Sequence, residues 1–289
     1  MEDKLPGIES PMSERVKFKE QPWHKYYQSE LKPKYSPIVR ILASRLQEGS
    51  QKRNPNITRR FVWWDIENHS IVVAETAHIM AENFQGELGA TPEETTAGAL
   101  LHDLTKPQEI IFDDLKDLAS QRAMIQNLVN AGFASYEDLD RFDKDPTQGL
   151  NIYETIIHEA EIKSLLREHQ RVLAEYGDPG RILDLSSSSG TPVVDLPKSE
   201  EGHHLPTSAH RIIFIADQLV QGTQIVPLEQ RHKKARQMYN PELVDRLYEY
   251  AYRCADEISR NLSLSSHSAL PEYIQSELVS SSASTSHNA

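Results

Sequence analysis

The chain has 289 residues and a formal net charge of −12, with 38% hydrophobic residues and a single cysteine, Cys254. This length and apolar content suffice for one large or two small domains, and one cysteine excludes both an intramolecular disulfide framework and a thiolate-rich zinc site. The acidic balance argues against an extended nucleic-acid partner. With no visible secretory signal and no run of about 18 apolar residues, we expect a cytoplasmic protein without membrane contact.

The first predicted elements are two helices separated by a polar stretch. Residues 1–55 are polar with scattered prolines and contain one predicted helix, from about Ser36 to Leu46, so we interpret them as an N-terminal extension that is partly helical and partly irregular. From Phe61 onward the pattern of polar and apolar residues changes. Apolar residues such as Ile71 and Ala77 recur at three- and four-residue spacing, which predicts a helix with one apolar face.

The next predicted helix begins at the run Thr91-Pro-Glu-Glu94. Thr is a preferred N-cap, Pro is tolerated in the first turn, and acidic residues there interact favourably with the helix dipole. The helix continues through Leu100 and Leu101 to the pair His102-Asp103.

The rest of the chain predicts further helices and two irregular segments. Helical patterns cover Ser120 to Ala131, Ser135 to Phe142, Asn151 to Tyr176, Thr207 or Ser208 to about Val220, and Asn240 to Leu262. Residues 177–206 lack a sustained period, which is typical of a lid, an insertion or a disordered loop. The serine-rich residues 263–289 predict a disordered tail. With no convincing strand pair, the fold class is all-α, with a main domain over residues 56–262.

The pair His102-Asp103 is the most informative feature of the chain. It follows an apolar helical stretch, and buried His and Asp lose hydration unless hydrogen bonds or a cation replace it. Adjacent residues diverge by about 100° within a helix, so both side chains reach one centre only where the helix ends. His69, which opens a predicted helix, and Asp217, inside the apolar run Ile212-Ile-Phe-Ile-Ala-Asp217, are its candidate partners.

These residues, in this order, resemble the HD superfamily of metal-dependent phosphohydrolases, an all-α helical bundle. The flanking segments that carry the resemblance are Glu67-Asn-His-Ser-Ile-Val-Val-Ala, Ala99-Leu-Leu-His-Asp-Leu-Thr-Lys and Ile213-Phe-Ile-Ala-Asp. The resemblance extends from about Arg59 to Thr223, or to the end of the following helix.

The resemblance implies that His69, His102, Asp103 and Asp217 hold a divalent ion, either Mn, Fe, Co, Mg or Zn. Lys106 matches the HDxxK variant of the motif and is the implied phosphate contact. Some members carry Glu at the position of Lys106 and use it to activate water, so that mechanism does not transfer. We therefore assign the catalytic roles to Asp103 and Lys106.

Three further positions are candidates for the site. Arg60 precedes His69 by nine residues and is a candidate substrate contact, because a guanidinium binds phosphate with two hydrogen bonds. His158 follows apolar residues on a predicted helix and is the candidate ligand for a second metal. His78, nine residues after His69, faces the opposite side of its helix and is excluded from the site.

The sequence leaves three functions open. The first is hydrolysis of a phosphate ester of a small metabolite or nucleotide by metal-activated water, with a small phosphorylated molecule as the partner. The second is a di-iron oxygenase, which needs two more histidines, His158 and either His203 or His204. The third is a non-catalytic regulatory or binding domain. The aromatic-rich helix that contains Tyr248 is a candidate surface for a homo-oligomer.

Overall fold

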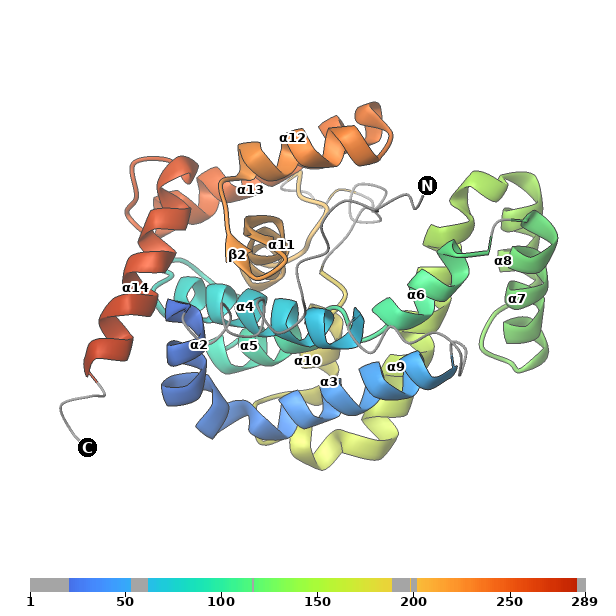
Figure 1. Cartoon of the computed structure of the whole chain (residues 1–289), viewed down its shortest axis with the longest axis horizontal. Helices are drawn as coiled ribbons and strands as arrows, with labels where there is room; N and C mark the ends of the chain where they lie inside the picture. Colours follow the sequence, from blue (N-terminus) through green and yellow to red (C-terminus); the bar gives the residue numbers. More distant parts are fainter. Residues whose placement is uncertain (1–20, 53–61, 116, 189–197, 199–201, 285–289) are drawn as a thin grey trace, which may run out of the picture.

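The computed structural model describes residues 21–52, 62–115, 117–188, 198 and 202–284, whose regular structure is helical apart from one short two-stranded ribbon (Figure 1). The first helices are α2 (Pro22–Tyr26), the π-helical turn η1 (Tyr27–Leu31), α3 (Lys32–Lys52), α4 (Val62–Glu82) and α5 (Pro92–Leu101). Then follow α6 (Lys106–Asp113), α7 (Leu118–Asn130), α8 (Tyr136–Lys144), the 3-10 turn η2 (Pro146–Gln148), α9 (Gly149–Leu173) and α10 (Pro179–Leu185). The C-terminal part contains α11 (Ser208–Leu219), β1 (Val220–Gln221), β2 (Gln224–Ile225), α12 (Leu228–Met238), α13 (Pro241–Asn261), η4 (His267–Ala269) and α14 (Leu270–Ser284). The predicted all-α class is confirmed.

Helix α11 lies at the centre of the main core. All 12 of its residues are buried, and it packs against α4, α5 and α13. A helix that is buried on every side is surrounded by protein, and an ionisable group on it loses hydration unless it finds a partner. Asp217 is the one carboxylate in this helix, so its partners decide whether the arrangement is stable.

The start and the packing of α5 determine where His102 lies. As predicted, Thr91 caps this helix: the Glu94 backbone N–H donates to Thr91 Oγ1 at 3.1 Å, and Glu94 Oε2 accepts from the Thr91 N–H at 2.8 Å. This reciprocal pairing satisfies two donors at the helix start. At Gly98 the helix approaches α10 so closely that a Cβ would lie 2.7 Å from the Cβ of Leu185.

A second, smaller core lies among α6, α7, α8 and α9, and it contains Phe112, Ile125, Leu139, Phe142, Ile152, Tyr153, Ile156 and Ile157. In Figure 1, α7 and α8 form a hairpin at the right edge of the molecule, away from α11. This hairpin accounts for part of the long stretch between Asp103 and Asp217. Among the described helices, none combines the length and the apolarity that crossing a membrane requires.

The predicted N-terminal extension joins the main core over residues 21–52. The helix expected from Ser36 to Leu46 lies within the longer α3. Trp23 is 3% exposed and Leu42 is fully buried, and both belong to the same hydrophobic cluster as α4 and α11. The remaining residues of the extension lie outside the described part of the chain.

The prediction of a disordered tail from Ser263 is wrong over α14. Leu270, Ile274 and Leu278 are each at most 1% exposed, and the helix packs against α2 and α4. Their spacing of four residues places them on one stripe of the helix. The serine-rich composition hides this stripe, because burying one helix face requires an apolar residue only about once per turn. Residues 285–289 lie outside the described part of the chain.

The segment 177–206 is also more regular than predicted, because it contains α10. Asp178 caps this helix by accepting a hydrogen bond from the Arg181 N–H at 2.7 Å, and Ile182 and Leu183 are fully buried. The buried residues anchor α10 in the main core. The expected lid spans residues 177–206, of which residues 189–197 and 199–201 lie outside the described ranges.

Replacing Ile274 by Ala tests whether α14 is part of the folded core. The substitution removes a fully buried side chain, and we expect the free energy of unfolding to fall by about 2–4 kcal/mol in urea titrations. The control is Val279→Ala on the same helix, where the side chain is 52% exposed and a change below about 0.5 kcal/mol is expected. Equal stability of both variants and the wild type would show an unfolded tail.

Candidate metal centre

Three helices bring the four predicted metal ligands together. His69 lies in α4, His102 and Asp103 directly follow α5, and Asp217 lies near the end of α11. Ligand atoms of His69, His102 and Asp103 all lie within 4.8 Å of one another. Asp217 Oδ1 lies 3.1 Å from His69 Nε2 and 3.9 Å from His102 Nε2. The first three residues therefore form a candidate cation site, and Asp217 lies beside both of its imidazoles.

The end of α5 allows adjacent residues to face the same centre. The helix ends at Leu101, and the backbone turns through residues 102–105 before α6 begins. Asp103 Oδ2 lies 3.6 Å from His102 Nε2 and 3.8 Å from His69 Nε2. His69, in contrast, does not open its helix. No proline or glycine separates it from Val62, and α4 begins there, about two turns earlier.

Backbone carbonyl groups determine the tautomers of both imidazoles. His69 Nδ1 lies 2.9 Å from the carbonyl oxygen of Gly222, and His102 Nδ1 lies 2.8 Å from that of Ala99. A carbonyl oxygen only accepts, so each Nδ1 carries a proton and donates it, and each Nε2 is the ring nitrogen that a cation would bind once it has no proton. Gly222 occupies the turn between β1 and β2 with φ +61°, a conformation that favours glycine.

One ring nitrogen of the centre is buried without a hydrogen-bond partner. His102 Nε2 has no hydrogen-bond partner among the described residues, and its side chain is fully buried. Leaving such a group unpaired costs about 1–3 kcal/mol. The carboxylates of Asp103 and Asp217 are acceptors too when ionised. A divalent cation satisfies all four groups at once, and this set of nitrogen and oxygen donors without thiolates fits Mn, Fe, Co, Mg or Zn.

The charges around the centre keep both carboxylates ionised at neutral pH. Burial alone raises the pKa of the Asp217 carboxyl, but the hydrogen bond to His69 and the charge of Arg231 outweigh it and hold the pKa below its usual range. The pKa of Asp103 is lowered in the same way, because His102 and Lys106 outweigh burial. Two carboxylates in this state attract a cation.

Lys106 places a positive charge beside these carboxylates. It is the first residue of α6 and its side chain is 42% exposed. Lys106 Nζ lies 2.8 Å from Glu109 Oε2, and Thr105 Oγ1 donates to Glu109 Oε1, also at 2.8 Å. Burial opposes the charge on the lysine, but Glu109 and Asp103 outweigh it and raise the pKa of Lys106. Lys106 is therefore a cation next to the centre.

Two residues near the centre were not predicted from the sequence. Glu154 of α9 shares a hydrogen bond with Glu109, and burial together with the Glu109 charge raises its pKa to about 7. Arg231 of α12 lies with its Nη2 3.7 Å from Asp217 Oδ1. Neither residue belongs to a sequence motif. The sequence nevertheless contains two signals. One is the helical spacing of Glu154 and His158, and the other is the basic run from Arg231 to Arg236.

Comparison with known families agrees with this geometry. A family model described as HD domain matches residues 66–221, which is more than half of the chain and includes all four converging side chains. The chain belongs to the HD domain family. No curated protein and no solved structure matches it. HD domains form a superfamily of metal-dependent phosphohydrolases, and the pair that names them is His102-Asp103 here.

Two further histidines of this HD domain lie apart from the centre. His78 Nδ1 lies 3.0 Å from Thr96 Oγ1, and burial lowers the pKa of His78 to about 4, so the ring is neutral and His78 faces away as predicted. His158 lies on α9 near Glu109, whose charge opposes the lowering of its pKa by burial. His158 is not in the group of ligand atoms around His102. A second-metal role for His158 stays a prediction.

The remaining candidates face other parts of the HD domain or cannot be placed. His203 Nε2 lies 3.4 Å from Glu257 Oε2, and the His204 ring lies 4.9 Å from the ring of Tyr250. Both contacts are to α13, so these histidines do not join the ligand atoms around His102. Arg60, the predicted substrate contact, lies outside the described residues.

Removing one imidazole tests the metal centre. We expect His102→Ala to lower the metal content of the purified full chain at least about tenfold after dialysis against micromolar Mn²⁺, because the remaining ligands cannot replace the buried nitrogen. Metal content is measured by inductively coupled plasma mass spectrometry. His78→Gln is the matched control and should retain the metal. Equal loss in both variants would contradict this assignment.

Glu154 predicts a specific pH dependence of stability. Its pKa of about 7 in the folded chain exceeds the ordinary value of 4.5, so the folded state binds a proton that the unfolded state releases. This contribution is fully present below pH 4.5 and is lost as the pH rises through 7. Between pH 5 and 8 the wild type should lose up to about 3 kcal/mol more unfolding free energy than Glu154→Gln.

The control for this measurement lies on the same helix. Glu159, whose side chain is 63% exposed, undergoes the same chemical change in Glu159→Gln. The unfolding free energy of the Glu159→Gln variant, measured in urea at each pH, should change with pH as that of the wild type does. Parallel profiles for Glu154→Gln and the wild type would show that Glu154 is ionised throughout this range.

Proposed function

We propose that this HD domain is a metal-dependent phosphohydrolase that cleaves a phosphate ester of a small metabolite or nucleotide. The observation that supports the proposal most directly is the buried His102 Nε2, an acceptor without a donor that faces two carboxylates. A divalent cation fits this site. A cation alone would also suit a structural metal site, so the reaction class rests on what surrounds it.

The surroundings favour phosphate chemistry because a lysine stands beside the centre. When bound, a divalent cation supplies a hydroxide near neutral pH and polarises a phosphoryl oxygen. The chain then has to bind the phosphate and stabilise the charge that develops on its oxygens. Lys106 has 42% of its side chain exposed and remains charged, so its Nζ is available to a phosphate oxygen while Glu109 holds it in place.

Asp103 is suited to orient the attacking water. One of its carboxylate oxygens faces both His69 and His102, at 3.8 and 3.6 Å between Oδ2 and the two Nε2 atoms. A carboxylate has a second oxygen, which accepts a hydrogen bond from a water molecule next to the ion. Because its pKa is lowered, Asp103 stays an acceptor at neutral pH.

The proposed substrate is small. The chain has a net charge of −12, which disfavours the polyanionic backbone of a long nucleic acid. The positive charges described near the centre, Lys106 and Arg231, are local and suit a single phosphate group. The di-iron alternative needs further histidine ligands, and His203 and His204 contact α13 instead.

Phosphate release from a panel of small esters tests the proposal. With Mn²⁺ we expect the full chain to release phosphate from at least one nucleotide or sugar phosphate, and chelation to stop it. Lys106→Ala should lower kcat/KM about 10- to 100-fold, which corresponds to a lost hydrogen bond between charged groups. Lys163→Ala, which alters a lysine with a 74% exposed side chain, is the matched control and should leave kcat/KM unchanged.

Two results would contradict the reaction class, and a third would contradict the site. One is metal binding without phosphate release from any ester of the panel, which would favour a regulatory domain. The other is oxygen uptake by the iron-loaded chain, recorded with an oxygen electrode, which would favour the oxygenase alternative. Phosphate release that survives Asp103→Asn unchanged would show that the activity comes from another site.

A further inference from the structure

Helix α12 lies outside the part of the chain that matches the HD family, yet one of its residues reaches the metal centre. The family match ends at residue 221, and α12 begins seven residues later. The helix packs against α11 and α13 and carries a basic run, Arg231-His-Lys-Lys-Ala-Arg236. Its positive charge contrasts with the acidic balance of the whole chain.

Arg231 is the residue of this run that points to the centre. Its Nη2 lies 3.7 Å from Asp217 Oδ1, the same oxygen that lies 3.1 Å from His69 Nε2. The arginine side chain is 25% exposed, so it is mostly buried but open on one side. A charge-assisted hydrogen bond to a carboxylate spans about 2.7–2.9 Å, so the contact with Asp217 is a long one. Arg231 also shares a hydrogen bond with Tyr248 of α13, and a guanidinium with five N–H donors keeps others for a further acceptor.

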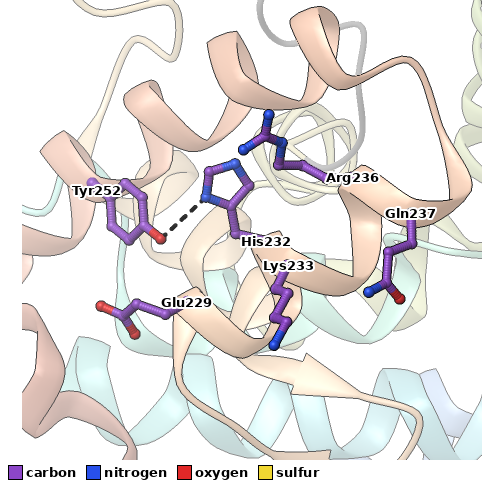
Figure 2. A pocket seen from close by; sticks show the side chains of 6 residues that line it. All are labelled: Glu229, His232, Lys233, Arg236, Gln237 and Tyr252. Carbon is purple, nitrogen blue, oxygen red and sulfur yellow. Dashed lines mark hydrogen bonds between the residues drawn. The ribbon is translucent and has the colours of Figure 1, made fainter.

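The backbone of α12 at Arg231 is held in place by contacts of the neighbouring residue. Its neighbour His232 stacks on Tyr248 of α13 with ring centroids 4.5 Å apart and an angle of 6° between the planes. His232 Nε2 donates to Asp245 Oδ1 at 2.9 Å, and the Tyr252 hydroxyl donates to His232 Nδ1 at 3.3 Å (Figure 2). With both ring nitrogens engaged, α12 is fastened to α13, which restricts the positions that Arg231 can adopt.

The charges of the centre indicate what Arg231 binds. A divalent cation compensates Asp103 and Asp217, and Glu109 compensates Lys106 at 2.8 Å. The charge of Arg231 is then in excess at the edge of a partly open site. A planar guanidinium with several donors matches the non-bridging oxygens of a phosphate group.

We propose that Arg231 is a substrate-binding residue that holds the phosphoryl group on the Asp217 side of the centre, while Lys106 holds it on the Asp103 side. The identity of the anion rests on the proposed function, whereas the position of Arg231 does not. In this arrangement α12 completes the binding site, because residues 66–221 supply Lys106 and α12 supplies the second cationic side chain.

The opposite face of α12 supplies a matched control. Two residues along a helix differ by about 200°, so Lys233 faces away from Asp217. It lines a surface hollow of about 380 Å³ together with Glu229, Arg236 and Gln237 (Figure 2). This hollow is the competing location for an anion, because it also carries cationic side chains.

Binding of inorganic phosphate to the full chain with Mn²⁺ present, measured by isothermal titration calorimetry, tests the proposal. We expect Arg231→Gln to weaken phosphate binding at least about tenfold, Arg231→Lys to weaken it less, and Lys233→Ala to leave it unchanged. Metal content should stay at the wild-type level in all three variants. A role for Arg231 in merely holding Asp217 would instead lower the metal content, and thermal unfolding verifies that each variant is folded.

The outcomes separate the two proposals. The Arg231 proposal is overturned if the wild type binds no phosphate, if Arg231→Gln binds it as the wild type does, or if Lys233→Ala weakens it as strongly. Phosphate binding that depends on Arg231, without hydrolysis of any ester, supports Arg231 and contradicts the phosphohydrolase function. Hydrolysis with unchanged phosphate binding in Arg231→Gln contradicts only the Arg231 proposal.

Discussion

The structure depends on a cluster of acceptors that need a cation. Two backbone carbonyl groups each accept a hydrogen bond from the Nδ1–H of an imidazole, so the Nε2 atoms of His69 and His102 are the ring atoms that face the two carboxylates. The buried His102 Nε2 has no hydrogen-bond partner among the described residues, which destabilises the fold, and a divalent ion would remove this penalty. We therefore expect binding of a divalent ion to increase the folding stability of this protein.

The helices around the cluster make the arrangement rigid. Helix α11 is buried on all sides and holds Asp217, while the end of α5 and the interior of α4 supply the other ligands. The turn at Gly222 adds the carbonyl that orients His69. Because these elements share one hydrophobic core, a ligand cannot shift without disturbing packing elsewhere.

Positive charge is arranged on two sides of the cluster and comes from different parts of the chain. Lys106 follows the His102-Asp103 pair directly and is held by Glu109, whereas Arg231 comes from α12 and approaches Asp217. Burial and the Glu109 charge raise the pKa of Glu154 to about 7, so the charge of this carboxyl changes near neutral pH. The proposed phosphate substrate would be attracted by both cations, which a site with Lys106 alone would not provide.

The sequence alone determined the helical class, several helix starts and the four converging side chains, because capping residues, apolar period and metal-capable side chains are local signals. Thr91, for example, caps α5 as its neighbours predict. Only the tertiary structure decided that the serine-rich tail contains a packed helix and that Arg231 reaches Asp217. Those facts depend on which helices pack together, and a contact between residues 14 positions apart across a turn leaves no periodic trace in the sequence.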